Sequence, residues 1–152
     1  MMSPETFALL QRLHGHAALL GLAVAAHPLI TLWTRRQLTR WTHRTAWMGA
    51  VLTAIPAAGG WALYPTYRNR IKLRLMSSGG DAWLWFETKE HLAAFCVALL
   101  VGGAATLTLA GATPEGRRAA WWLILMGWLC GAAAGALGVA VAGMAHPAWL
   151  VR

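Results

Sequence analysis

Charged residues are scarce in this chain, and acidic residues are the scarcest of them. Only 12% of its 152 positions are charged, five of them Asp or Glu, whereas 58% are hydrophobic. Soluble domains carry about 25% charged residues. The deficit falls in long blocks, which excludes a disordered tail, a coiled coil and a water-facing enzyme. The composition predicts an integral membrane protein with a single domain over residues 1–152.

The sequence also lacks the motifs of many soluble enzymes. It has two cysteines, Cys96 and Cys130, and no CxxC or CxxCH, so we expect neither a disulfide framework nor a covalently attached c-type haem. It has no glycine-rich phosphate loop, no HExxH and no GxSxG, so phosphoryl transfer and classical hydrolysis lack support. The first apolar block is not preceded by the basic region of a signal peptide, which predicts a retained helix.

Basic residues are abundant but concentrated between the apolar blocks. Thirteen Lys and Arg give a formal net charge of +8. Most of them are Arg35, Arg36, Arg40, Arg44, Arg68, Arg70, Lys72, Arg74, Arg117 and Arg118. Cations at the ends of membrane spans contact anionic lipid headgroups. We therefore expect this charge to meet lipid, and no nucleic acid.

Four apolar blocks without a central charge are each long enough to cross a bilayer, which takes about 20 residues. The first and third connections are short, which favours antiparallel neighbours. The expected fold is all-α, an up-down-up-down bundle of four transmembrane helices with both termini on one side. The helices are expected near residues 5–34, 42–65, 81–111 and 118–146. We expect such a protein in a bacterial inner (cytoplasmic) membrane.

Tryptophan and glycine mark two further features of these spans. Nine of the ten tryptophans fall near expected span ends, where indoles settle at headgroup level, and Trp128 lies deeper. Gly127, Gly131 and Gly135 recur every four residues, so they line one helix face and allow another backbone to approach. Tight helix packing is favoured over a flat cleft for a planar cofactor. We take this face as a candidate contact with partner subunits.

Histidines supply the chemistry expected of these spans. His14, His16 and His91 lie at similar depth near one end of the expected bundle, and His146 returns to that end. Two imidazoles from facing helices are what a low-spin b-type haem takes as axial ligands in a bundle core. We predict that His16 or His14 binds haem iron opposite His91.

His27 lies deeper in the first span. It follows His16 by eleven residues, which places it on nearly the same face about 16 Å further along the helix. His27 can therefore serve a second haem or a quinone. The candidate cofactor-binding residues are His14, His16, His27 and His91. The expected cofactors are one haem b, or two, with a quinone as a further candidate.

Each of these histidines also has a purely structural explanation. His14, His16 and His91 fall at the expected water boundary, where an imidazole is solvated at little cost. His27 can hydrogen-bond a main-chain carbonyl freed by Pro28.

Acidic residues near the start of the third span allow two interpretations. Glu87 and His91 are four residues apart and share a helix face, so they can bind a non-haem metal together with a histidine of the first span. The same acids can instead form ion pairs with the basic middle connection. The ion-pair network is the favoured interpretation.

Together these patterns predict a membrane b-type cytochrome-like subunit that carries electrons between quinol and another redox centre within a larger complex. It would act as an electron-transfer subunit of a membrane oxidoreductase, with other membrane subunits and lipid as partners. A cofactor-free accessory or scaffold subunit is the alternative, which the glycine face and the tryptophans suit equally well. A small transporter or channel ranks last, because only His27 and a few threonines offer a polar path.

Overall fold

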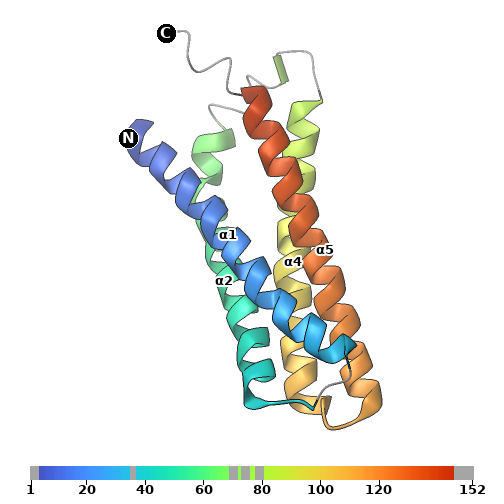
Figure 1. The fold of residues 1–152 in the computed structure, drawn as a ribbon. Coiled ribbons are helices and arrows are strands. Elements are labelled where there is room, and N and C mark those ends of the chain that lie inside the picture. Colours follow the sequence, from blue (N-terminus) through green and yellow to red (C-terminus); the bar gives the residue numbers. More distant parts are fainter. Residues whose placement is uncertain (1–3, 35–36, 69–71, 73–75, 78–80, 146–152) are drawn as a thin grey trace.

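The computed structural model describes residues 4–34, 37–68, 72, 76–77 and 81–145, and in these residues the only long elements are helices. The long helices are α1 (Pro4–Trp33), α2 (Arg40–Tyr67), α4 (Ala82–Ala110) and α5 (Pro114–Ala145). They run antiparallel, so the start of α1 and the end of α5 lie at one end of the molecule (Figure 1). We call this the terminal end, and the end with the α1–α2 and α4–α5 connections the loop end. The all-helical prediction is confirmed.

Three of these helices contain a segment long and apolar enough to cross a membrane. The segments are Arg12–Trp33 in α1, Trp83–Ala110 in α4 and Pro114–Ala142 in α5. By helix length and composition the chain is thus suited to a membrane, as predicted. The fourth helix, α2, is 28 residues long and lies in the same bundle.

Two helices begin earlier than the apolar pattern predicted, because polar residues cap them. α2 begins at Arg40 rather than near residue 42, with Thr39 as its N-cap in a capping box with Thr42. α5 begins at Pro114 rather than near residue 118, and the Thr113 hydroxyl accepts a 3.0 Å hydrogen bond from a main-chain N–H of its first turn. Threonine at the N-cap and proline at the first helical position both favour a helix start.

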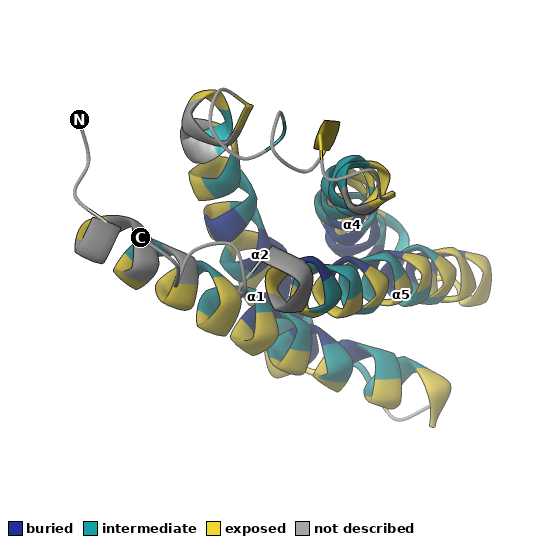
Figure 2. Cartoon of the chain, turned by 90° about the horizontal axis from the view of Figure 1, so that it is seen from above, coloured by how far each residue is buried: buried dark blue, intermediate teal, exposed yellow. Residues whose placement is uncertain are grey.

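The bundle consists of two helical hairpins. α1 packs on α2 and α4 packs on α5, while α2 against α4 and α1 against α5 join the hairpins. α1 and α4 therefore occupy opposite corners of the bundle (Figure 2).

The buried core lies towards the loop end and is rich in small residues. It comprises Ala25, Ala46, Ala50, Cys96, Leu100, Ala104, Leu107, Ala120 and Ile124. A Cβ atom added at Gly49 would lie 2.9 Å from the Ala25 Cβ, and one at Gly103 would lie 2.5 Å from the Ile124 Cγ1. Helices in lipid associate through close van der Waals packing, which such small residues allow.

Two of the three regularly spaced glycines of α5 pack inside the chain. A Cβ at Gly127 would lie 3.1 Å from side chains of α4, and one at Gly131 would lie 2.6 Å from the Leu22 Cδ2 of α1 and 2.8 Å from the Cys96 Sγ. A Cβ at Gly135 would have no described atom within 4 Å. The face taken as a candidate contact with partner subunits is thus occupied by this chain's own helices at two of its three positions.

The deep tryptophan and the loop-end tryptophans join different helices. The indole N–H of Trp128 donates to the Leu22 carbonyl of α1 at 3.0 Å. Trp33 stacks on Trp121 near the loop end, with ring centroids 5.4 Å apart.

The expectations for residues 70–75, apart from Lys72, and for His146 concern positions outside the described residues.

Candidate functional site

His16 and His27 both lie on the exposed face of α1, in agreement with their spacing of eleven residues. This outer stripe consists of Leu9, Arg12, Leu13, His16, Leu19, Leu20, Ala23, His27 and Ile30, all of them exposed. The other face of α1, with the buried residues Gly21, Ala25 and Pro28, packs into the bundle. In a membrane the outer stripe meets lipid or another protein chain. Ionisable residues on such a face are costly and usually functional.

The His16 ring is fixed by its own helix. Its Nδ1 lies 2.7 Å from the main-chain oxygen of Arg12, one turn earlier. Because a carbonyl oxygen only accepts hydrogen bonds, Nδ1 carries the proton and donates it. In the neutral ring, Nε2 therefore holds the free lone pair.

The His27 ring is fixed by the neighbouring helix. Its Nδ1 lies 2.8 Å from the Thr45 hydroxyl of α2. That hydroxyl has one proton, and its donor contacts are to the carbonyls of Trp41, at 2.9 Å, and Thr42, at 3.2 Å. With the hydroxyl proton on one of these carbonyls, the Thr45 oxygen accepts from Nδ1–H of His27, which again leaves the lone pair on Nε2. The partner is a hydroxyl group rather than the carbonyl freed by Pro28 that the sequence suggested.

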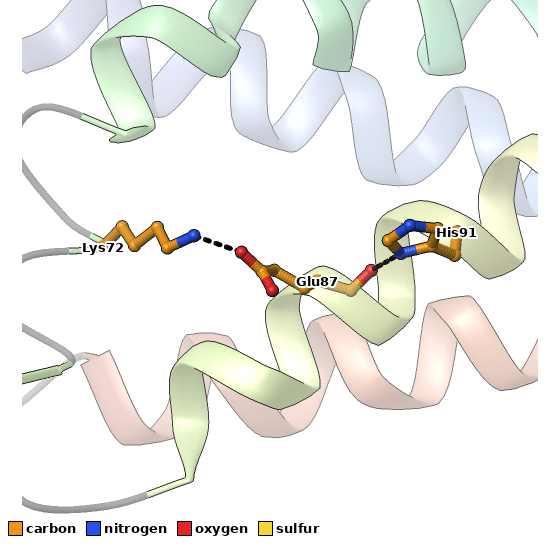
Figure 3. Close-up of polar contacts among 3 residues, drawn as sticks. All are labelled: Lys72, Glu87 and His91. Carbon is orange, nitrogen blue, oxygen red and sulfur yellow. Dashed lines mark hydrogen bonds and ion pairs between the residues drawn. The ribbon is translucent and has the colours of Figure 1, made fainter.

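The His91 ring on α4 is fixed by its own helix, as the His16 ring is on α1. Its Nδ1 donates to the main-chain oxygen of Glu87 at 2.8 Å (Figure 3), and His91 is exposed. The Glu87 carboxylate points the other way and forms an ion pair with Lys72 of the connection between α2 and α4 (Figure 3). For Glu87, the ion-pair interpretation of the acidic residues is thus confirmed.

These three imidazoles share the state that metal-binding histidines adopt. A histidine that ligates a metal donates its other ring N–H to a carbonyl, carboxylate or similar acceptor, which fixes the tautomer and the ring orientation. His16, His27 and His91 each make that hydrogen bond through Nδ1. Each can therefore offer Nε2 to a haem iron.

His14 lies on the opposite face of α1 and turns into the bundle. The ring is partly buried next to Gly60 of α2, and the main-chain oxygen of Pro56 lies near it. Its Nδ1 is buried and has no hydrogen-bond partner among the described residues. Lys89 of α4 lies within electrostatic reach of the ring.

The structure does not bring the proposed axial ligands together in one core site. His16 and His91 occupy the outer faces of helices at opposite corners of the bundle. In the described part of the chain, no group of three or more His, Cys, Asp and Glu residues could hold a metal ion. His43 of α2 lines a depression with Thr108 of α4 at the loop end.

Lys89 is the interior residue that the sequence reasoning missed. It is partly buried, and its Cδ lies 3.5 Å from the position of a Cβ at Gly138 of α5. Its inward position could have been read from its spacing of seven and eleven residues from the buried Cys96 and Leu100, which places all three residues on one helix face.

Comparison of the chain with protein-family models, curated proteins and solved structures gives no match. Function is therefore inferred from the side chains themselves.

Proposed function

We propose that this chain is a membrane b-type cytochrome-like subunit that carries electrons between a quinol and another redox centre within a larger complex. The observation that carries this proposal is the pair His16 and His27. Both lie on the exposed face of one helix, and each has Nδ1 hydrogen-bonded and the lone pair on Nε2. When bound, haem b supplies reversible one-electron oxidation and reduction.

The spacing of the pair suits transfer across a membrane. Eleven residues of α-helix place His16 and His27 about 16 Å apart along α1, which is about half the thickness of the hydrocarbon layer. One helix face can therefore hold two haems at different depths, or one haem and a second cofactor. His91 on α4 offers a further ligand of the same tautomer at the terminal end.

The outer position of these imidazoles implies partner subunits. Each histidine would hold a haem iron from a face that this chain's other helices leave uncovered. A helix of another subunit, packed against α1 or α4, would complete each haem site. Lipid covers the remaining apolar surface, which includes Trp61 and Leu109.

We further propose that all four helices span the cytoplasmic membrane of a bacterium. α2 is 28 residues long, about 42 Å at 1.5 Å per residue, which exceeds the roughly 30 Å of hydrocarbon. Its arginines Arg40, Arg44 and Arg68 lie near its two ends, where long cationic side chains reach the headgroups.

An absorption spectrum tests the proposal. The tagged chain is purified with its bound partners in mild detergent, and the reduced-minus-oxidised difference is recorded. We expect an α-band in the b-haem region. A complex that lacks this band would support the cofactor-free accessory or scaffold subunit instead.

A further inference from the structure

The interior of the bundle changes character from one end to the other. Towards the loop end, the inward-facing positions hold aliphatic side chains such as Leu100, Leu107 and Ile124, all buried. Towards the terminal end, α5 still buries Ala134 and Val141, but the inward faces of α1 and α4 carry His14 and Lys89. An imidazole and an ammonium group in place of packed aliphatic residues are costly within a membrane protein and indicate a use.

Two glycines make the space that these side chains occupy. A Cβ at Gly60 of α2 would lie 3.3 Å from the His14 Cε1, and a Cβ at Gly138 of α5 would lie 3.5 Å from the Lys89 Cδ. Each polar side chain therefore lies against a glycine, which has no side chain, on a neighbouring helix. All four helices contribute to the surroundings of His14 and Lys89. The Lys89 Nζ also lies 4.6 Å from the centre of the Phe86 ring.

The charges around the pair suit a neutral ligand. Lys89 lies within electrostatic reach of both His14 and Glu90. Glu90 is partly buried and offsets the ammonium charge, so a lipid phosphate would meet an acid as well as a cation. The Lys89 ammonium group is a hydrogen-bond donor, and His14 Nδ1, a donor or an acceptor according to the tautomer, is buried without a partner among the described residues.

We propose that His14 and Lys89 bind the headgroup of a quinone in the interior of the terminal end. A quinone is neutral, planar and lipid-soluble, and one of its carbonyl oxygens can accept from the ammonium group of Lys89. His14 Nδ1 hydrogen-bonds the other oxygen, as a donor to the quinone carbonyl or as an acceptor from the quinol hydroxyl, according to the tautomer of the ring. This inference rests on the proposed function, in which a quinol is the electron donor. It assigns that ligand to the inner face of α1, whereas the haem ligands His16 and His27 belong to its outer face.

The test measures binding of decyl-ubiquinone and a short-chain menaquinone analogue to the full chain in phosphatidylcholine nanodiscs. We expect the variants Lys89→Met and His14→Leu each to weaken binding about tenfold or more, the effect of losing one hydrogen bond of about 1.4 kcal/mol. Matched controls are Lys72→Met, a cation outside the bundle interior, and His43→Leu, a histidine at the loop end. Both controls should bind as the unchanged chain does.

Two further measurements separate the outcomes. Thermal unfolding of each variant reports folding, and Lys89→Met should fold because replacing a buried charge by an apolar side chain of similar length is often neutral or stabilising. Short-chain phosphatidylglycerol is offered in a parallel titration. The proposal is overturned if neither quinone binds, if folded Lys89→Met and His14→Leu both bind like the controls, or if the phospholipid binds in their place. Quinone binding by a complex without a b-haem α-band would overturn the proposed function alone.

Discussion

The indole of Trp128 on α5 donates a hydrogen bond to the main-chain oxygen of Leu22 on α1, 3.0 Å away. The bond joins the two helical hairpins near the middle of the bundle, where α1 and α5 meet. It explains why one tryptophan lies deep in a span while most of the others gather near the helix ends. A buried indole needs an acceptor for its N–H, and a helix carbonyl can accept a second hydrogen bond.

Replacing Trp128 with Phe should therefore loosen the bundle. We expect the free energy of unfolding to fall by about 0.5–1.5 kcal/mol, since interhelical hydrogen bonds in membranes are of this size. Unfolding by sodium dodecyl sulfate in mixed micelles measures the change. Trp61→Phe is the control, because Trp61 is 83% exposed and its loss should leave the midpoint nearly unchanged. Equal effects of the two substitutions would contradict the assignment.

Two adjacent glycines of α4 should respond in opposite directions to alanine. A Cβ at Gly103 would lie 2.5 Å from the Ile124 Cγ1, whereas one at Gly102 would have no described atom within 4 Å. We expect Gly103→Ala to destabilise the chain by about 1–3 kcal/mol through overpacking, partly offset by the better helix propensity of alanine. Gly102→Ala should be neutral or stabilising by up to about 1 kcal/mol. The midpoints of thermal unfolding of the two variants are compared in one detergent. Similar midpoints would show that Ile124 of α5 is not packed against Gly103.

Replacing Gly131 with Leu should unfold the isolated chain rather than release a partner. A side chain there meets Leu22 and Cys96 of two neighbouring helices. We expect a loss of at least about 2 kcal/mol in the free energy of unfolding. Gly135→Leu is the matched control on the same face, with no described neighbour within 4 Å of its Cβ. If Gly131→Leu leaves the isolated chain stable and frees it from its complex, the glycine face contacts a partner after all.

The apolar blocks predicted the four helices well, but they did not predict where two of them start. Thr39 with Thr42, and Thr113 with Pro114, extend α2 and α5 beyond the apolar pattern. The threonines are polar, so hydropathy placed these positions in loops. The capping signals were readable from the sequence.

In the candidate site, the sequence predicted which residues of one helix share a face but not which residues of different helices face each other. Spacing within α1 predicted correctly that His16 and His27 share a face, because eleven residues of helix close nearly three turns. Spacing says nothing about how one helix is rotated relative to another. Whether His16 and His91 face each other across a core, and whether Lys89 turns inward, depends on that rotation. Small residues such as Ala25 and Gly49, where helices approach closely, fix it.

The bond between His27 and Thr45 should couple the two residues energetically. We expect a double-mutant cycle of His27→Leu and Thr45→Val to give a coupling of about 0.6 kcal/mol, the average for such pairs in membranes. The cycle is measured by unfolding in mixed micelles. As a control, pairing His27→Leu with Thr108→Val should give no coupling, because Thr108 bonds Trp47 of α2 instead. Additive effects in both cycles would mean that the hydrogen bond is not formed.

The most direct test of the central claim is the haem content of the purified complex after single changes on the outer face of α1. The ratio of haem b to chain is measured for His16→Leu and His27→Leu, with His43→Leu as the control at the loop end. The account predicts that each outer-face variant inserts normally and loses b-haem α-band amplitude, while the control keeps all of it. An unchanged ratio in both His16→Leu and His27→Leu would contradict the account.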